Sequence, residues 1–509
     1  MSVNLLAWIS SPLAVIKLVI KPGVAVPCGV PCRAGHRLSS VVLSAVLLSV
    51  LVACGGGGGG GTPTNGASAD TATGGDPSSG GGDTGVCGVD SQKTFVKQVA
   101  DDWYLWYDEM AVVDPAEFND AQSYLNALTA PLASDDRDPG FSYLTTREQD
   151  EAALNSGAYV GFGFRYGFDE ANRLRFSDVF EGGPAGDAEI QRSDILLAID
   201  TGNGFETTEQ LAARNASNEE IFGPSELGVE RAFRIQQGTE TREVTLVKRE
   251  LVTPALAGLP RLIEREGLSP VGYVHMRAFI NSAENPLNNM AQTFANAGVS
   301  DLIVDFRYNG GGLLSVAEQL LNVLAGEAAT GQESFRISHN VKRSNENVST
   351  FFARPQAPLS PLRIAFIVTG ATASASELVI NSIAPYIDLV MVGEDTLGKA
   401  VGQYAFDQSG CETRLRLVSF EIVNGEGQGG YYTGLADTGR FTLCPAQDDL
   451  TRPFTDSREN SLSVALDWLS SGACSAVAAK RAVDPYAPLP DWGLARQVDK
   501  PFGRSPWVQ

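Results

Sequence analysis

The stretch that decides the fold runs from Pro361 to Gln403 and reads PLRIAFIVTGATASASELVINSIAPYIDLVMVGEDTLGKAVGQ. Its first apolar run, Ile364 to Thr369, is rich in β-branched residues and predicts a buried strand. A helix is predicted from Thr372 or Ser374 to about Tyr386, and Leu389 to Val392 predicts a second buried strand. Strand, crossover helix and strand form a βαβ unit, so we expect the two strands to be parallel.

Two polar side chains follow these strands. Ser374 comes just after the first strand, and Lys399 lies in the predicted loop after the second. Reactive groups gather beyond the carboxyl ends of parallel strands, so we expect both at one edge of the sheet. A third apolar run, Asp301 to Phe306, precedes three glycines, Gly310 to Gly312, and a predicted helix from about Leu313 to Leu324. If this strand joins the same sheet, its glycine turn brings bare backbone N–H groups to that edge, which completes the parts needed for acyl transfer.

These motifs resemble those of the C-terminal processing peptidases, a family of Ser–Lys serine endopeptidases that carry a PDZ domain. The nucleophile motif matches Ser374 to Glu377, a Gly-Lys turn follows 25 positions later at Lys399, and a glutamine stands four beyond it at Gln403. The signature Asp-x-Arg-x-Asn-x-Gly-Gly matches Asp305 to Gly312. The resemblance covers residues 92 to 472 and implies an α/β fold, with a crotonase-like spiral of ββα units as the peptidase core.

The resemblance also implies a role for each residue. Ser374 would attack the peptide carbonyl, neutral Lys399 would take its proton, and Gln403 would orient the lysine. The oxyanion would be held by backbone N–H groups, at Ala375 and at Gly311 or Gly312. Each role has a plainer alternative: Ser374 and Glu377 fit a helix capping box, and a loop lysine is ordinarily solvated. We expect Ser376, two residues along the helix, to support the site.

Histidine and metal chemistry have few candidates in this sequence. The three histidines are His36, His275 and His339, and His275 lies in a predicted strand, where we expect a hydrogen-bonded sheet residue. The scarcity of histidine favours lysine as the base. No His/Cys/Asp cluster has metal-ligand spacing, so we expect neither a metal nor an organic cofactor.

The first residues predict export. Residues 1–53 contain four basic and no acidic residues, and the apolar run Val41 to Val52 is too short to span a bilayer and fits a signal-peptide core. It ends at Leu51-Val52-Ala53-Cys54, which resembles a bacterial lipobox with Cys54 as the lipidated residue; a retained membrane anchor is the alternative. The residue directly after Cys54 is glycine and not aspartate, so resemblance to other lipoproteins favours a periplasm-facing position on the outer membrane. With 60 acidic against 38 basic residues, the chain is not expected to bind nucleic acid.

Residues 145–250 resemble a PDZ domain. Residues 160–164 match the loop whose N–H groups hold a peptide's terminal carboxylate, and two phenylalanines would shape a pocket for the last side chain. The residues expected to bind peptide are Gly161, Phe162, Gly163 and Phe164. An acidic patch, 215–226, departs from the compact pattern of such domains. An aromatic stripe before this region, within two predicted helices between Ser91 and Ala130, is expected to pack rather than bind a ligand.

The predicted organisation has six parts. They are a signal segment (1–53), a Gly/Ser-rich tether (54–86), a helical region (87–144), a PDZ domain (145–250), a Ser–Lys peptidase core (251–474) and an extended Pro-containing tail (475–509). Four cysteines follow Cys54 and allow three pairings. We favour Cys411–Cys444, which brackets a hairpin-like excursion, and Cys87–Cys474, because domain ends often lie close together.

The leading hypothesis is therefore a lipid-anchored serine endopeptidase of the bacterial cell envelope. It would cut proteins with free C-termini near those ends; an activating adaptor is not identified by the sequence. A non-catalytic PDZ scaffold on a peptidase-like core is the main alternative. A crotonase-type acyl-CoA enzyme is a third, which leaves the PDZ segment unexplained.

Overall fold

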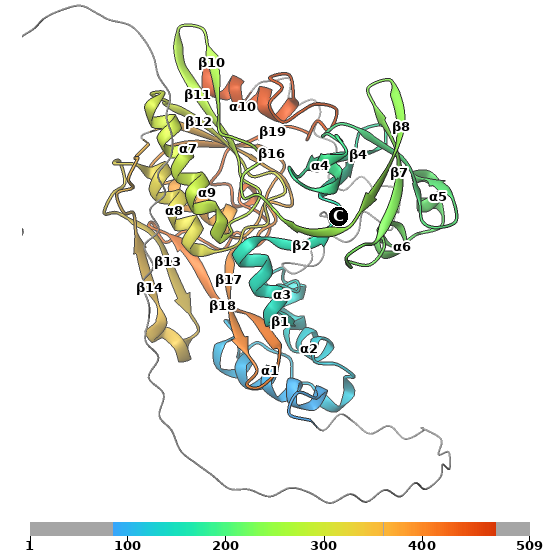
Figure 1. Ribbon diagram of the computed structural model, residues 1–509. Coiled ribbons are helices and arrows are strands. Elements are labelled where there is room, and N and C mark those ends of the chain that lie inside the picture. Colours follow the sequence, from blue (N-terminus) through green and yellow to red (C-terminus); the bar gives the residue numbers. More distant parts are fainter. Residues whose placement is uncertain (1–84, 360, 475–509) are drawn as a thin grey trace, which may run out of the picture. The chain divides into compact units, whose positions relative to one another are not determined.

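The computed structural model describes residues 85–359 and 361–474 (Figure 1). One six-stranded sheet carries the stretch that the sequence singled out, in the order β10-β11-β12-β15-β16-β19. From β11 to β19 all neighbours are parallel, and β10 is antiparallel to β11. The strands are β10 (Arg261–Arg265), β11 (Leu268–His275), β12 (Asp301–Asp305), β15 (Arg363–Val368), β16 (Asp388–Gly393) and β19 (Leu443–Pro445).

The predicted βαβ unit is confirmed, and the third predicted strand does join the same sheet. β12 pairs with β15, and β15 pairs with β16, both in parallel. Helices cover both faces of this sheet, so its strands are apolar throughout. Leu302 and Val304 pack toward three helices, whereas Ile303 between them packs toward α10 (Asn460–Ser471). The three helices are α7 (Glu284–Asn296), α8 (Leu314–Ala325) and α9 (Ala375–Ile383).

A second sheet is antiparallel and lies beside the predicted lysine loop. Its order is β1-β18-β13-β14, and β17 also pairs with β18. Its strands are β1 (Tyr143–Thr146), β13 (Glu333–His339), β14 (Val348–Phe351), β17 (Val401–Asp407) and β18 (Thr413–Asn424). Lys399 lies in a loop after β16, as predicted, whereas Gln403 lies on β17. The segment VGQYAFD has weak strand periodicity by itself, and pairing with the long β18 supplies its backbone hydrogen bonds.

The N-terminal helices pack on this second sheet. α1 (Val89–Trp103) and α2 (Ala121–Ser134) share a buried cluster with residues of β18. The two predicted helices are present, with a short 3-10 turn (Pro115–Glu117) between them that Asp114 caps; Asp120 caps α2. The aromatic stripe packs as predicted: the Trp103 ring lies 5.6 Å from that of Tyr404.

Residues 158–252 form a β-rich unit with its own core. Its main sheet has the order β3-β4-β5-β7-β8, with β6 beside β5, and β2 pairs with β9 separately. The acidic patch of the sequence contains a short helix, α6, whose Ile221 and Phe222 are buried. The elements are β2 (Ala158–Gly161), β3 (Phe164–Phe168), β4 (Leu174–Val179), α4 (Pro184–Asp187), β5 (Ile195–Asp200), β6 (Phe205–Thr207), α5 (Thr208–Ala213), α6 (Asn218–Phe222), β7 (Glu230–Gln237), β8 (Glu240–Val247) and β9 (Arg249–Val252).

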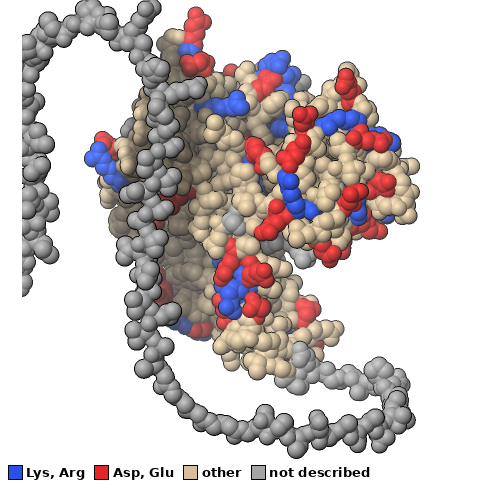
Figure 2. All heavy atoms as spheres, viewed as in Figure 1, with Lys and Arg blue, Asp and Glu red and all other residues tan. Residues whose placement is uncertain are grey.

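Short helical elements complete the described part of the chain. They are α3 (Arg147–Glu151), a π-helical turn (Ala152–Ser156) and 3-10 turns at Asn281–Ala283, Val341–Glu346 and Ala436–Thr438. Among the described residues, no helix combines the length and the apolar composition that crossing a bilayer requires. Acidic and basic side chains are interspersed on the face shown in Figure 2.

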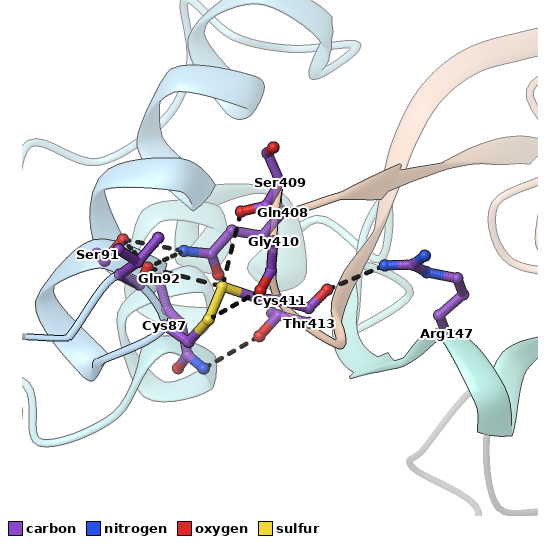
Figure 3. Close-up of a disulfide and its surroundings, with 10 residues drawn as sticks. Cys87, Ser91, Gln92, Arg147, Gln408, Ser409, Gly410, Cys411 and Thr413 are labelled. Carbon is purple, nitrogen blue, oxygen red and sulfur yellow. Dashed lines mark hydrogen bonds between the residues drawn. A yellow bond between two sulfur atoms is a disulfide. The ribbon is translucent and has the colours of Figure 1, made fainter. Parts of the chain in front are cut away.

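The predicted disulfide pairing is wrong. The structure joins Cys87 to Cys411 (Figure 3) and Cys444 to Cys474. Cys411 lies in the turn between β17 and β18, next to the start of α1, whereas Cys444 lies in β19 of the other sheet. The excursion between Cys411 and Cys444 therefore connects two sheets and is not a hairpin. Cys474 lies shortly after the end of α10 at Ser471, and α10 packs on the sheet that contains Cys444.

Several predictions fall outside the described residues. These concern the signal segment, the lipobox with Cys54, all but the last residues of the tether, and the tail from 475 to 509.

Candidate active site

Ser374 occupies a strained turn between β15 and α9. Its backbone has φ +57° and ψ −114°, a conformation that non-glycine residues seldom adopt, and its side chain is half-buried. Backbone strain of this kind concentrates at functional sites. A sharp strand-to-helix turn of this type exposes a serine hydroxyl at the edge of the sheet.

The glycine turn after β12 packs directly against this serine. A methyl group at Gly311 would lie 2.8 Å from the Ser374 Cβ and 2.7 Å from the Ala375 nitrogen, so no larger residue fits. The turn is also bonded to the nucleophile loop, because the Ala373 N–H donates to the Asn309 carbonyl at 3.0 Å. The sequence expectation that the two loops meet is therefore confirmed.

Two side chains hold the backbone of the glycine turn. The Gly311 N–H donates to the Asn309 side-chain oxygen at 2.9 Å, so of the two glycines expected to hold the oxyanion, Gly312 remains. Ser376 is fully buried and its hydroxyl donates to the Asn309 carbonyl at 3.1 Å. Ser376 thus supports the site, as predicted.

Glu377 connects the serine loop to the lysine loop. Its fully buried carboxylate accepts N–H bonds from Ser374 (2.7 Å), Gly398 (2.7 Å) and Lys399 (2.9 Å). The bond to Ser374 is the half of the predicted capping box made by the glutamate side chain. The capping pattern indicated Glu377, but the two bonds to the distant lysine loop had no sequence signal. Burial raises the pKa of Glu377 to about 7, against the opposing effect of these hydrogen bonds.

Lys399 is buried rather than solvated. It is 2% exposed, and its Nζ lies 2.5 Å from the Gln403 side-chain oxygen. Burial lowers the pKa of Lys399 to about 7, although the charges of Asp138 and Glu377 favour the ammonium form. Near neutral pH a large share of this lysine is thus uncharged and able to accept a proton.

Gln403 is oriented by a residue from the N-terminal part of the chain, which the sequence reasoning missed. The Gln403 amide nitrogen donates to the carbonyl oxygen of Phe141, so its amide oxygen faces the lysine. The Phe141 ring also lies under Lys399, with Nζ 5.1 Å from the ring centre. The motif spacing gave no hint of this contact, because it joins residues far apart in sequence.

Two family models match this chain over segments that contain residues of the site. Residues 270–436 match the model of peptidase family S41, and residues 91–143 match the model of the peptidase S41 N-terminal domain. The chain carries peptidase family S41 domains. The second match includes Phe141, and the first includes Ser374, Lys399 and Gln403.

Two curated relatives are each about a quarter identical to this chain over roughly half of its length. This chain is 27% identical over 269 residues to a carboxyl-terminal-processing protease of Synechocystis, and the aligned region covers 52% of this chain and 59% of that protein. It is 28% identical over 264 residues to the chloroplastic carboxyl-terminal-processing peptidase 2 of Arabidopsis thaliana, covering 50% of this chain and 48% of that one. The chain thus spans about half the length of the curated relatives it matches.

A solved structure shows the same fold. A Bacteroides fragilis protein, described as a candidate S41 protease, superposes with a TM-score of 0.61 at 24% identity. The match covers 74% of this chain and 97% of that protein.

A buried ion network lies behind the glycine turn of the S41 domain. Arg307 is fully buried and pairs with Asp305 (2.6 Å), Asp448 (2.8 Å) and Glu459 (3.0 Å). Burial favours the neutral form of Asp305, but the Arg307 guanidinium holds its pKa well below the usual range. Arg192 of the β-rich unit joins the network through Asp448 at 2.6 Å. The network fixes the turn that carries the glycines, since truncating one partner would leave a buried charge unpaired.

Of the two histidines among the described residues, His275 and His339, neither is hydrogen-bonded to Ser374. His275 is buried in β11, with its Nε2 3.4 Å from the Arg307 carbonyl, and burial lowers its pKa to about 4. Its Nδ1 has no partner among the described residues, so the prediction of a hydrogen-bonded sheet histidine holds for one nitrogen only. His339 contacts Asn347 and Tyr404.

The loop expected to bind a peptide carboxylate lies between β2 and β3. Gly163 has φ +86°, and a methyl group there would come within 3.0 Å of the Gly183 Cα. Phe162 and Phe164 are fully buried and pack around Phe233, so the expectation that they shape a pocket is wrong for this structure. Burying both rings in the core removes more apolar surface from water than lining an open pocket would.

Proposed function

We propose that this chain is a serine endopeptidase that cuts protein substrates near their C-termini, with Ser374 as nucleophile and Lys399 as general base. The observation that carries the proposal is the buried lysine, whose pKa is lowered to about 7 and whose backbone shares a carboxylate oxygen with Ser374. A solvated surface lysine would be neither buried nor joined to Ser374 through a shared carboxylate. The names of the curated relatives support the choice of cleavage site.

The residues act in the order that their chemistry requires. The Ser374 hydroxyl attacks the peptide carbonyl as its proton passes to neutral Lys399 Nζ, while the Gln403 oxygen holds the amine in place. The tetrahedral oxyanion is stabilised by N–H groups of Ala375 and Gly312. Lys399 then gives its proton to the leaving amine, which breaks the peptide bond. Water hydrolyses the acyl-enzyme with the lysine again as base.

The β-rich unit would select free C-termini as a PDZ domain does. β3 is the end strand of its sheet, the position at which a PDZ domain adds a peptide strand. The glycine loop before β3 would hold the terminal carboxylate with its N–H groups. A peptide held there would present the region near its C-terminus to the S41 domain.

The proposed location is the periplasm-facing side of the outer membrane, with a lipid at Cys54. Support comes from the lipobox pattern and from two disulfides in the described part of the chain, which suit an oxidising compartment. Cys54→Ser should abolish lipidation. If the variant stays in the membrane fraction and has the same gel mobility as the wild type, the proposal of a lipid anchor at Cys54 is contradicted.

Cleavage of dye-labelled casein by purified protein tests the proposed activity. The wild type should release fragments and Ser374→Ala should release none, while both should melt at similar temperatures. Mass spectrometry of a folded substrate with an unstructured tail should locate the cuts near the free C-terminus. Equal cleavage by Ser374→Ala would overturn the mechanism. An inactive wild type that still binds free-acid peptides would instead favour the non-catalytic scaffold.

A further inference from the structure

A turn from the N-terminal S41 domain reaches the catalytic lysine. It runs from Asp138 to Ser142 and connects α2 to β1. Asp138 is fully buried, and its carboxylate accepts bonds from the Ser142 N–H (3.0 Å), the Ser142 hydroxyl (2.7 Å) and the Tyr104 hydroxyl (2.9 Å). The Val418 N–H of β18 donates in turn to the Ser142 hydroxyl at 3.1 Å. Asp138 therefore fixes the turn to α1 and to the second sheet at once.

The turn presents one backbone group to the active site. The Phe141 carbonyl accepts the Gln403 amide nitrogen, which leaves the amide oxygen of Gln403 directed at Lys399 Nζ. An amide group has two nearly isosteric orientations, and only one offers an acceptor to the lysine. The carbonyl of Phe141 selects that orientation, so the position of this turn decides how the lysine is held.

We propose that the Asp138–Ser142 turn is a positioning element of the active site and that Asp138 is its positioning residue. Asp138 acts through the Phe141 carbonyl on the orientation of Gln403, and through its charge on the protonation of Lys399. The inference rests on the proposed function and deepens it, because it makes the N-terminal domain part of the catalytic machinery.

The charge of Asp138 predicts the direction in which the pKa of Lys399 should change when that charge is removed. Among the described residues, charges that act on Lys399 include Asp138 from the turn, Arg416 from β18 and Glu377 from α9. The two carboxylates raise the pKa of the lysine, and Arg416 lowers it. Arg416 is itself paired with Asp150 at 2.5 Å. Removing the charge of Asp138 should lower the pKa of Lys399, so more of the lysine is neutral at a given acid pH.

Asp138→Asn tests the charge with little change of shape. An asparagine oxygen can accept the Ser142 N–H, and its amide can donate to the hydroxyls of Ser142 and Tyr104, so the turn can keep its bonds. The acid limb of casein cleavage should move to lower pH, by about one pH unit. Asp136→Asn is the matched control: it removes the same charge from the same segment, but Asp136 is exposed. Its pH profile should match that of the wild type.

A purely structural role for Asp138 would lower the melting temperature and leave the acid limb in place. An Asp138→Asn profile that coincides with those of the wild type and Asp136→Asn would thus overturn the inference. Failure of the proposed function is a different result, namely cleavage by Ser374→Ala or no cleavage by the wild type.

Tyr104→Phe provides a second test that keeps the charge and removes one bond to Asp138. The looser turn should lower kcat several-fold and leave KM unchanged, because Tyr104 is fully buried. A lower melting temperature with unchanged kcat would contradict a positioning role. If Asp138→Asn fails to fold, Tyr104→Phe still tests the positioning role of the turn.

Discussion

The backbone N–H groups of Ser374 and Lys399 donate to the same atom, the Oε2 oxygen of Glu377, at 2.7 and 2.9 Å. Ser374 begins the helix after β15, and Lys399 follows β16, so one buried carboxylate joins the loops at the ends of two neighbouring strands. The relative position of the proposed nucleophile and base is therefore set by backbone bonds rather than by their flexible side chains.

Glu377→Gln should weaken this connection. The amide offers one acceptor oxygen and an NH₂ group, whereas three N–H groups now share two carboxylate oxygens. At least one buried N–H loses its acceptor, at a cost of about 1–3 kcal/mol in the free energy of unfolding. Chemical denaturation should show this loss together with a fall in kcat, and Glu240→Gln on the exposed start of β8 should show neither. Wild-type kcat in Glu377→Gln would contradict the role.

Ser374→Asn separates a nucleophile from a helix cap. Asparagine caps helices about as well as serine and tolerates positive φ, so the variant should fold with near wild-type stability. It has no hydroxyl, so it should not cleave casein. Ser374→Gly should also be inactive but more stable by about 1 kcal/mol, because glycine removes the strain of φ +57°. Denaturation curves and casein cleavage check both. Activity in folded Ser374→Asn would refute the nucleophile.

The lowered pKa of Lys399 predicts how activity should depend on pH. The ammonium form cannot accept the Ser374 proton, so activity should be low below the pKa of the lysine and rise as pH passes through about 7. Lys399→Arg should be inactive at every working pH, since a guanidinium stays protonated. Lys97→Arg, the same change on the surface of α1, should leave the pH profile unaltered. A flat rate across neutral pH in the wild type would argue against lysine as the base.

The sequence predicted the loops of the site better than the contacts between them. Periodicity and the glycine turn placed β12, β15, β16 and α9 within a few residues, because these buried strands and an amphipathic helix carry strong local signals. β17 was missed, since Val401 to Asp407 becomes a strand only by pairing with β18.

Contacts across long sequence separations had no local signal at all. Phe141 contacts Gln403 across a sequence separation of 262 residues. Asp138 is fully buried, and its hydrogen-bond partners come together only in the folded turn. The predicted disulfide pairing was wrong for the same reason, because Cys87 and Cys411 are brought together by the packing of α1 on the second sheet.

The two disulfides should differ in what they contribute to stability. Cys87–Cys411 closes a loop with a sequence separation of 324, and Cys444–Cys474 closes one of 30. In the chain-entropy model these correspond to upper limits of about 6 and about 4 kcal/mol. Replacing the first pair with alanines should therefore lower the unfolding midpoint more than replacing the second. Non-reducing peptide mapping checks the connectivity, and a Cys411–Cys444 peptide would contradict it.

Gly311→Ala tests the contact between the glycine turn and the nucleophile loop. Its methyl group would meet the Ala375 nitrogen at 2.7 Å and the Ser374 Cβ at 2.8 Å, so backbone must move at the reacting serine. A displacement of about 1 Å can cost about 100-fold in rate, so kcat should fall at least that far. Gly331→Ala is the matched control, because Gly331 also has positive φ (+82°) but nothing within 4 Å of the added methyl. Both variants carry the backbone strain, and only Gly311→Ala adds the clash. If the two lose the same activity, the close approach of Gly311 to Ser374 has no part in catalysis.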